Sequence, residues 1–303
     1  MIAGAIRALR DVGADVAEDV PLAPYTTLRV GGPARFMVTV DDEPALAGAL
    51  RVAVAAGLPW FVLGRGSNLL VPDAGWPGLA LRLEGRIRAV DVDGPLVRAG
   101  AAAPLPTVAN RAAEAGLGGF AWGVAVPGSI GGAVRMNAGA HGADMRDALV
   151  SARLLRAGSD LAEDVPADRL GLRYRGSDVP DDAVVTAAVL RLAPADATEV
   201  RAEMDDIRAW RRAHQPLHAA TCGSVFTNPP DGSAGRLIEE AGLKGHRVGG
   251  ATVSPTHANF IETSPGSRAD DVLRLIDEVR TAVARHSGVE LAVEVVVLGT
   301  TGR

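Results

Sequence analysis

Three polar residues in the second half of the chain could transfer a proton or stabilise charge. Glu294 is the lone acid in the apolar run 291–298, and an unpaired buried carboxylate is costly, so we expect a partner or a bound proton there. A solvent-facing glutamate on an edge strand is the alternative. Ser224 lacks the G-x-S-x-G setting of a hydrolase nucleophile, and Arg175 follows one of the chain's two tyrosines. Taken alone, they are typical of a loop serine and a surface arginine.

Lys244 is the only lysine in the chain. The chain has 31 basic residues, and every one except Lys244 is an arginine. An ammonium and a guanidinium differ in shape and hydration, so a single retained lysine indicates a site that needs a compact ammonium. The alternative is that this one lysine remains by chance. No G-x-x-x-x-G-K-[ST] loop surrounds Lys244 and no H-E-x-x-H sequence occurs, so we expect neither ATP hydrolysis nor a metal site.

Residues 116–142 are the most glycine-rich segment of the chain. They contain nine glycines in 27 positions and one formal charge, Arg135. Glycine forfeits side-chain packing, so such a density is retained mainly where the main chain takes a positive φ or approaches another group closely. Large apolar residues interrupt the segment, unlike an ordinary surface loop. We therefore predict a large ligand against bare main chain, with a run of tight turns as the alternative.

A second glycine pair follows an apolar stretch at residues 60–63. The sequence Gly64-Arg65-Gly66-Ser67-Asn68-Leu69 lacks the third glycine of a Rossmann dinucleotide fingerprint. Its main-chain N–H groups and the Ser67 hydroxyl can still surround a phosphate as an anion nest. The sequence therefore predicts phosphate binding without an ordinary Rossmann unit.

The overall composition limits the function classes. The 303 residues suffice for two or three domains. A formal charge of −5 gives no basic field for nucleic acid. The first 20 residues carry four acids and lack the apolar core of a signal peptide or membrane span, so we expect a cytoplasmic protein with no membrane partner. The single cysteine, Cys222, excludes an internal disulfide.

The elements that must position these residues alternate between helices and strands. Periodicity and stop signals predict helices at 43–56, 107–115, 199–214 and 234–241, and strands at 60–63, 149–155 and 183–192. The charged helix at 199–214 could link two domains. Ser267 and Asp270 have capping-box spacing, and the run 291–298 predicts a central strand. Five apolar residues share one face of the helix after that box: Val272, Leu275, Ile276, Val279 and Val283.

Eight segments, taken in order, resemble the family of UDP-N-acetylenolpyruvoylglucosamine reductase (MurB), a flavoenzyme of bacterial peptidoglycan synthesis. Any one of them is a weak signal, but their order and spacing are specific and span nearly the whole chain. The segments are residues 26–34, 63–70, 116–142, 174–177, 222–229, 241–250 and 257–260, with Glu294 last.

The resemblance implies an α+β fold of the vanillyl-alcohol-oxidase (PCMH) FAD-binding type plus a C-terminal α/β substrate-binding domain. We expect an FAD-binding region at 1–195, with subdomains at about 1–84 and 85–195, and a linking helix at 196–213. A substrate-binding domain follows at 214–289, and a strand at 290–303 returns toward the FAD-binding region. Because no insertion follows Arg175, the chain resembles the shorter class of the family, without a tyrosine-bearing lid.

The resemblance also implies cofactors and residue roles. Noncovalent FAD would accept hydride from NADPH and pass it to the enolpyruvyl group of a UDP-sugar. Arg175 and Glu294 match the pair that polarises the substrate carboxylate, and Ser224 matches the proton donor to C2. Residues implied to contact FAD are Gly64, Arg65, Gly66, Ser67, Asn68, Leu69, Pro127, Gly128, Ser129, Gly131, Gly132, Asn137 and Gly139. Residues implied to contact the substrate are Tyr174, Asn228, Lys244 and His257.

The chain departs from the family pattern at a few positions. Arg65 replaces a frequent glycine, Ala121 a frequent glutamate and His141 a common tyrosine. Val296 stands where an arginine usually follows the catalytic glutamate by two residues. Two other functions remain open at this stage: a related FAD-dependent oxidase or dehydrogenase acting on another sugar or alcohol, and a noncatalytic protein that binds flavin or a UDP-sugar.

Overall fold

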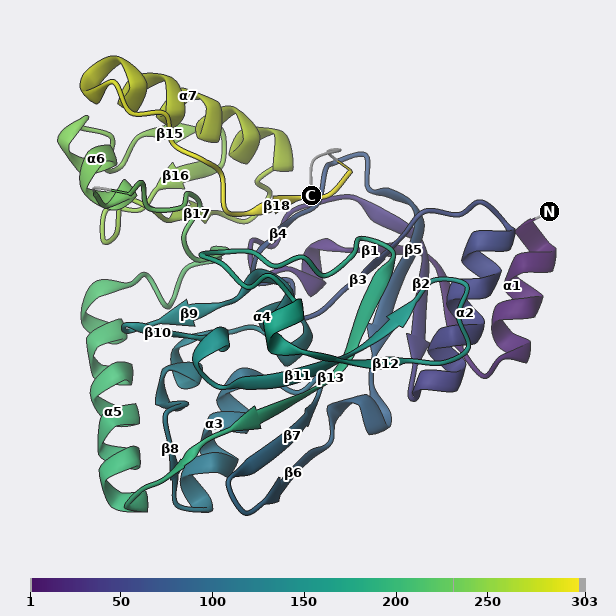
Figure 1. Cartoon of the computed structure of the whole chain (residues 1–303). Helices are drawn as coiled ribbons and strands as arrows, with labels where there is room; N and C mark the ends of the chain where they lie inside the picture. Colours follow the sequence, from purple (N-terminus) through teal and green to yellow (C-terminus); the bar gives the residue numbers. More distant parts are fainter. Residues whose placement is uncertain (1, 231, 300–303) are drawn as a thin grey trace. The chain divides into compact units, whose positions relative to one another are not determined.

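The computed structural model describes residues 2–230 and 232–299. The chain forms two compact units, each built from separated segments, and Figure 1 traces their elements. Unit 1 comprises the residues up to Glu18, Phe36–Gly64 and Pro77–Trp210. Unit 2 comprises Asp19–Arg35, Arg65–Trp76 and the residues from Arg211 onward. Each unit has its own cluster of buried apolar residues.

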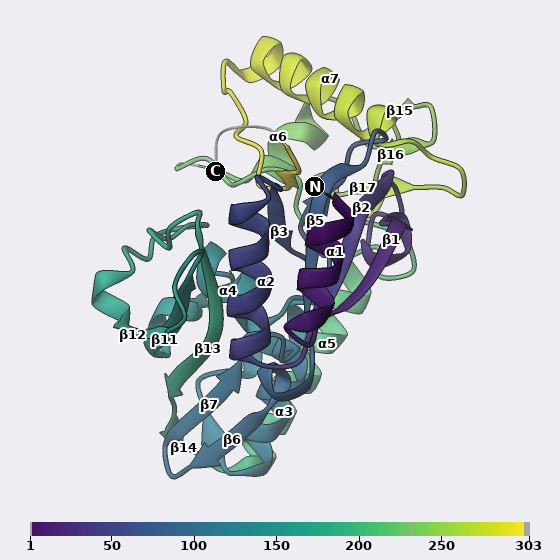
Figure 2. The ribbon, with the colours of Figure 1, turned by 90° about the vertical axis from the view of Figure 1, so that its right-hand side faces the viewer.

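A four-stranded sheet lies in the N-terminal part of the fold. Its order is β1 (Asp15–Pro21), β2 (Pro33–Val40), β5 (Trp76–Leu83) and β3 (Trp60–Val62). Helices α1 (Ile2–Asp11) and α2 (Glu43–Ala55) lie side by side on one face of it (Figure 2). Asp42 caps α2, because its carboxylate accepts the Ala45 N–H at 2.9 Å. The predicted helix at 43–56 and strand at 60–63 are confirmed within one residue.

A five-stranded antiparallel sheet forms the second layer of unit 1, in the order β12-β11-β13-β7-β6. The helices α3 and α4 belong to the same unit, and α4 packs against β13. The strands are β6 (Val90–Asp93), β7 (Leu96–Gly100), β11 (Leu149–Arg156), β12 (Glu163–Pro166) and β13 (Ala183–Arg191). The α-helices are α3 (Leu105–Glu114), α4 (Ile130–Met136) and α5 (Ala197–His214).

Short elements complete the chain up to α5. Two-residue strands pair as β8 (Leu117–Gly118) with β14 (Ala193–Pro194), and as β9 (Gly139–Ala140) with β10 (Ala143–Asp144). The 3-10 turns are η1 (Ala23–Tyr25), η2 (Gly85–Arg88), η3 (Ala121–Ala125), η4 (Met145–Asp147) and η5 (Ala167–Arg169). The predicted helices at 107–115 and 199–214 and strands at 149–155 and 183–192 are confirmed, with ends shifted by up to two residues.

Unit 2 contains a small antiparallel sheet with two helices. Strand order is β15 (Arg247–Val248), β16 (Ala251–Val253) and β17 (Ile261–Thr263). The helices are α6 (Ala234–Glu240) and α7 (Ala269–Ser287). The predicted stripe of α7 is confirmed, because all five of its apolar residues are buried. Leu28, Val30 and Leu70, from far earlier in the chain, belong to the same cluster.

The predicted central strand at 291–298 is wrong. Only β18 (Val296–Val297) forms a ladder, in parallel with β4 (Leu69–Leu70). Upstream of β18, the Glu294 N–H donates to Val225 O instead. The chain therefore changes partners within the apolar run, which packs in a core without being a continuous strand. Residues 300–303 of the predicted return strand lie outside the described residues.

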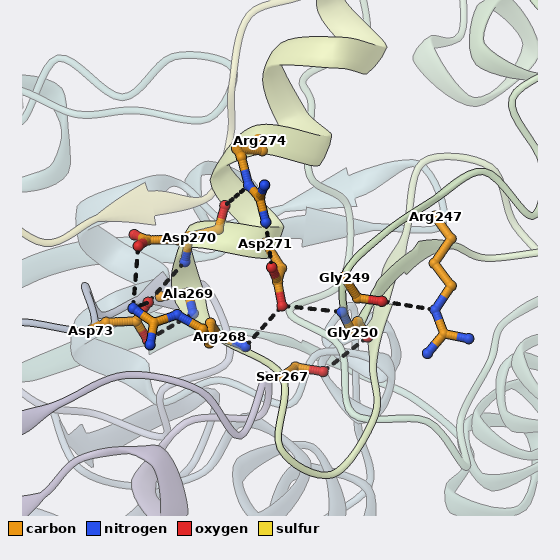
Figure 3. A network of polar contacts seen from close by, with 10 residues as sticks. All are labelled: Asp73, Arg247, Gly249, Gly250, Ser267, Arg268, Ala269, Asp270, Asp271 and Arg274. Atoms are coloured by element: carbon orange, nitrogen blue, oxygen red, sulfur yellow. Dashed lines mark hydrogen bonds and ion pairs between the residues drawn. The ribbon is translucent and has the colours of Figure 1, made fainter.

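The capping box predicted for Ser267 and Asp270 is also wrong. The N-cap of α7 is Arg268, whose N–H donates to Asp271 Oδ2 at 3.2 Å. Ser267 Oγ donates to Gly250 O at 2.9 Å (Figure 3). The Gly250 N–H and the Arg268 N–H, both donating to the carboxylate, hold the pKa of Asp271 below its usual range.

Asp73, almost two hundred residues upstream, accepts from the first amides of α7. Its carboxylate takes the Ala269 N–H at 3.0 Å and the Asp270 N–H at 3.1 Å (Figure 3). The Arg268 guanidinium lies 3.3 Å from the same carboxylate. A long-range carboxylate thus does the work that the sequence pattern assigned to a local serine, and it ties the segment after β4 to α7.

We predict that Asp73→Ala lowers the free energy of unfolding by about 1–2 kcal/mol, because two helix-terminal amides lose their acceptor. Asp73→Asn keeps one acceptor oxygen, so its loss is smaller. Urea unfolding followed by tryptophan fluorescence measures both values, with Asp93→Ala on exposed β6 as a matched control. Equal stability of Asp73→Ala and this control would contradict the capping role.

Candidate functional site

The Ser129 hydroxyl is the centre of a glycine-lined surface in unit 1. Ser129 is the N-cap residue of α4, and within the described part of the chain its hydroxyl has no hydrogen-bond partner. A Cβ added to Gly64 would lie 3.0 Å from this oxygen, and one added to Gly132 would lie 3.8 Å from it. Both glycines are exposed. Two loops distant in sequence therefore present bare main chain around one available hydroxyl.

The main chain that carries Ser129 is fixed from behind. Ile130 N–H donates to Ala103 O at 3.0 Å, and Gly131 N–H donates to Ala101 O at 2.8 Å. A Cβ at Gly131 would come within 3.0 Å of Ala101 Cβ, so glycine is needed there for close packing. These contacts fix the segment from Gly128 onward, as preorganised ligand binding requires.

The surface around Ser129 fits a dinucleotide cofactor. Two exposed glycines provide bare main chain, and Ser129, which is 7% exposed and has no hydroxyl partner among the described residues, provides a donor for a phosphate group. Trp122, which lies just upstream of Ser129 and is 3% exposed, has an indole N–H without a hydrogen-bond partner among the described residues. An unpaired buried donor is costly, and such a group calls for a bound partner. The residues present are thus compatible with FAD.

Asn137 organises the turn that carries Arg175. It is fully buried, ends α4 in the left-handed conformation, and its Nδ2 donates to Arg173 O at 3.1 Å and to Asp144 Oδ2 at 2.9 Å. Its Oδ1 accepts the Arg146 N–H. The Asn137 amide is therefore fully occupied by protein groups, and any contact between Asn137 and a cofactor would come from its main chain.

The guanidinium of Arg175 rests on the same glycine-rich segment. Its Nη2 donates to Gly139 O at 3.2 Å, and its Cζ lies 4.9 Å from the ring centre of Tyr174. Arg175 itself has φ +53°, inside a turn closed by paired hydrogen bonds between Arg173 and Gly176. A non-glycine residue with positive φ is strained, so this turn is held by its surroundings and aims the Arg175 side chain.

Arg135 is a residue whose structural role the sequence reasoning missed. Its guanidinium donates to the carbonyls of Val179, Pro180 and Ala183, the last at 2.5 Å. Its own carbonyl accepts the Ser177 hydroxyl at 2.7 Å. Burial lowers the pKa of Arg135, and the charge of Asp181 opposes that shift. Its position as the only formal charge in the glycine segment was the available signal.

In unit 2, the loop at residues 65–69 has a rigid base. Gly66 has φ +59°, and a Cβ there would lie 2.2 Å from Tyr25 O. Gly66 O accepts both the N–H and the hydroxyl of Thr27, at 3.1 and 3.3 Å. Ser67 is half-buried, and no described residue forms a hydrogen bond with its hydroxyl. The loop therefore keeps the Ser67 hydroxyl available, as an anion nest would require.

Ser224 and Glu294 lie on adjacent segments of unit 2. Ser224 forms an isolated bridge with Phe260, and the next residue, Val225, accepts the Glu294 N–H at 2.8 Å. Glu294 is half-buried, less enclosed than its apolar surroundings in sequence indicated. Within the described residues, the half-buried Ser224 hydroxyl has no hydrogen-bond partner. Burial, and then the charge of Glu294, raises the pKa of the nearby Cys222 thiol to about 12.

A basic pair, Lys244 and His257, lies beside α6 in the same unit. Lys244 Nζ is 2.7 Å from Glu239 Oε1, and a Cβ at Gly235 would lie 3.4 Å from His257 Cε1. His257 Nδ1 accepts the Asn259 N–H at 3.2 Å, which leaves the proton of a neutral ring on Nε2. Burial lowers the pKa of His257, and the charge of Lys244 lowers it further. Asn228 Oδ1 accepts the Ala234 N–H at the start of α6.

Comparisons with known proteins decide the family. A domain model described as the C-terminal domain of UDP-N-acetylenolpyruvoylglucosamine reductase matches residues 215–298, and an FAD binding domain matches residues 34–163. UDP-N-acetylenolpyruvoylglucosamine reductase 2 of Symbiobacterium thermophilum is 43% identical over 292 residues, covering 96% of this chain and 94% of the relative. The chain belongs to the UDP-N-acetylenolpyruvoylglucosamine reductase family. The resemblance stated from the sequence is confirmed.

Further relatives of the reductase family agree. The reductase of Anaeromyxobacter sp. (strain Fw109-5) is 45% identical and covers 96% of this chain and 91% of its own. The crystal structure of the MurB enzyme from Thermus caldophilus has a TM-score of 0.80 and 37% identity, covering 94% of this chain and 98% of its own. The predicted α+β fold of the PCMH type is confirmed. A berberine bridge enzyme variant, with a TM-score of 0.50 and 14% identity, shares only the fold.

Among the described residues, no group of three or more histidine, cysteine or acidic residues is placed to hold a metal ion. No helix in this part of the chain is both long enough and apolar enough to span a membrane.

We predict that Gly132→Leu weakens FAD binding by at least about tenfold in Kd, because the side chain would occupy the space beside Ser129 Oγ. The FAD-free protein should be as stable as the wild type or slightly more stable, since leucine is the better helix former. Gly4→Leu, on α1 with open space around it, is the matched control. Fluorescence titration with FAD and thermal unfolding give the two readouts, and an unchanged Kd for Gly132→Leu would remove Gly132 from the cofactor surface.

Proposed function

We propose that this protein reduces the enolpyruvyl ether of UDP-N-acetylglucosamine enolpyruvate to UDP-N-acetylmuramate, a precursor of peptidoglycan. The observation that carries the proposal is family membership over 96% of the chain. The relatives in this comparison carry the reductase name. The chain is thus an FAD-containing oxidoreductase with NADPH as reductant.

Two groups of residues, one within each unit, are proposed to contact the cofactor. Bound FAD would supply the hydride chemistry between NADPH and the enolpyruvyl group. In unit 1, the Ser129 surface with Gly64 and Gly132 would contact the cofactor through main-chain N–H groups and the Ser129 hydroxyl. In unit 2, the main-chain N–H groups of residues 65–69 and the Ser67 hydroxyl would bind a phosphate group. Glycine at Gly64 and Gly132 leaves the main chain accessible to the cofactor.

Ser224 is proposed as the proton donor to C2. Once hydride has arrived at C3, negative charge develops at C2 and is shared with the carboxylate, so C2 is basic enough to take a proton from a hydroxyl in a dry site. The Ser224 hydroxyl is half-buried and has no competing partner among the described residues. These two properties support its role, because an internally bonded hydroxyl would first have to break that bond.

Arg175 and Glu294 are proposed to hold the substrate carboxylate and stabilise the charge that develops there. A guanidinium matches a carboxylate geometrically, and a glutamate can share a proton with it. Arg175 is aimed by its positive-φ turn and by Gly139 O, so it is preorganised for this role. Tyr174, which lies under the guanidinium, is proposed to contact the substrate as well.

The basic pair beside α6 is proposed to bind the diphosphate of the nucleotide sugar. Lys244 has three N–H donors and its contact with Glu239 uses one direction only. Burial lowers the pKa of His257 and so favours the neutral ring, whose Nε2–H faces no competing bond from Nδ1, which accepts the Asn259 N–H. Asn228 begins the turn that leads into α6 and completes the proposed set. A compact ammonium suits a diphosphate, which agrees with the survival of one lysine among thirty-one basic residues.

The domain limits, compartment and partners form part of the same proposal. We assign residues 1–195 mainly to FAD and 214–289 to the nucleotide sugar, joined by the helix at 196–213 and completed by 290–303. NADPH and a nucleotide sugar are both highly charged and do not cross membranes unaided, so we place the reaction in the cytoplasm. Its partners are then small molecules, without nucleic acid or membrane.

Absorbance spectra of the purified protein test the proposed function. We expect a yellow protein with extractable FAD, bleached by NADPH without oxygen and recoloured by UDP-N-acetylglucosamine enolpyruvate. Recolouring by another sugar or alcohol, and not by this substrate, would support a related oxidase or dehydrogenase. Bound flavin that neither ligand alters would indicate a noncatalytic protein, and either result would sink the reductase proposal.

Substitution of Ser224 tests its role as proton donor. We expect Ser224→Ala to leave the rate of flavin bleaching by NADPH within about twofold of wild type, and to slow recolouring by substrate about 10²–10⁴-fold, as for a lost proton-transfer group. Ser177→Ala removes a serine hydroxyl that donates to Arg135 O, and serves as a matched control for a structural hydroxyl. Equal losses in the two half-reactions of Ser224→Ala would contradict the assignment.

A further inference from the structure

Asn68 joins the loop of residues 64–69 to the main chain of Glu294. Asn68 Nδ2 donates to Glu294 O at 3.2 Å, across 226 positions of sequence. The Asn68 main-chain carbonyl accepts the Val296 N–H at 3.1 Å. One asparagine therefore holds the chain on both sides of Val295, with its side chain at Glu294 and its carbonyl at Val296.

The neighbouring strands continue this attachment. β4 and β18 pair in parallel with Val296 opposite Leu69 and Val297 opposite Leu70. Leu298 N–H donates to Leu70 O at 2.9 Å. The ladder thus begins two residues after Glu294, and the Asn68 side chain adds a contact to the residue that carries the carboxyl group.

The opposite side of Glu294 is attached to the segment of Ser224. Glu294 N–H donates to Val225 O at 2.8 Å, and Val225 N–H donates to Asn259 O at 2.9 Å. The main chain of Glu294 is therefore held at its N–H by the Ser224 segment and at its carbonyl by Asn68. Of these two attachments, only the one from Asn68 uses a side chain, so it can be removed by substitution.

The loop that contains Asn68 is held rigidly at Gly66. The next residue, Ser67, has a hydroxyl that is available for a ligand. Gly66 is locked against Tyr25 and Thr27, whereas the Ser67 hydroxyl is left without a partner in the described residues. Consecutive residues of one loop thus have different tasks: Ser67 faces a proposed anion, and Asn68 holds Glu294. We propose that Asn68 is a positioning residue, which fixes the Glu294 carboxyl for substrate reduction and makes the cofactor loop and that carboxyl one rigid group.

This inference rests on the proposed function, because it assigns Glu294 to the substrate carboxylate. Displacement of a positioned group by about an ångström costs about a hundredfold in rate, although the group itself is unchanged. Loss of the Asn68 amide should therefore slow the step that uses Glu294 much more than the step that does not. A residue that only binds cofactor, or only stabilises the fold, would give no such difference.

The test uses Asn68→Ala in the full-length holoenzyme at saturating FAD. We expect recolouring by UDP-N-acetylglucosamine enolpyruvate to be slowed about 10- to 100-fold more than bleaching by NADPH is. Asn110→Ala is the matched control, because it deletes an amide that donates to a main-chain carbonyl, Pro106 O at 2.7 Å, at an exposed position of α3. The control should match wild type in both half-reactions.

Two further readouts separate positioning from a structural role. In a double-mutant cycle, Asn68→Ala should add little to the loss caused by Glu294→Gln, since the two act as one unit. Hydrogen exchange of the FAD-free protein should show faster exchange at the amide of Val296 in Asn68→Ala but not in Asn110→Ala. Asn68→Asp, which keeps the shape but cannot donate to Glu294 O, repeats the test if Asn68→Ala folds poorly.

Three outcomes would overturn the positioning role. They are weaker FAD binding with both half-reactions normal at saturation, equal losses in the two half-reactions, and additive effects of Asn68→Ala and Glu294→Gln. Each leaves the proposed function intact as long as the wild-type protein is recoloured by the substrate. Failure of the wild type itself to be recoloured overturns the proposed function instead, so the two failures are distinguishable.

Discussion

A glycine-rich main chain can bind a large anion only if other residues hold that main chain in place. Glycine leaves space for a ligand, but it also leaves the chain free to move, and every buried N–H and C=O group must still find a partner. In unit 1 the carbonyls of residues 101 and 103 fix the start of α4, and Asn137 fixes its end. The main-chain conformation of the exposed glycines beside Ser129 depends on these contacts.

The need to satisfy buried main-chain groups also explains several polar side chains that bond to segments far away in the sequence. Arg135 binds three carbonyls of the segment before β13, and Asn137 binds the turn of Arg175. In unit 2, Asp73 accepts two amides of α7 and Asn68 donates to the carbonyl of Glu294. Each of these side chains satisfies main-chain groups that no regular helix or sheet satisfies. Two of them hold segments that carry proposed site residues: Asn137 bonds to the main chain of the Arg175 turn, and Asn68 bonds to the main chain of Glu294.

Three of the proposed ligand-contacting groups are hydroxyls that are available for a ligand. The hydroxyls of Ser67, Ser129 and Ser224 have no partners among the described residues, whereas the amide of Asn137 is fully used. Cys222 illustrates the opposite case, because burial raises its pKa to about 12 and keeps the thiol uncharged beside Glu294. The structure thus separates groups that are free to meet a ligand from groups that only build the framework.

The sequence by itself determined the glycine-rich segments, most helices and strands, the buried stripe of α7 and the family, because these depend on local periodicity and on the order of short motifs. It could not find the cap that Asp73 provides, the contact between Asn68 and Glu294, or the broken strand at 291–298. These depend on pairs separated by up to 226 residues, and no local pattern records such a pair. Only folding brings the partners together, since a buried main-chain group bonds to whatever the tertiary structure places beside it.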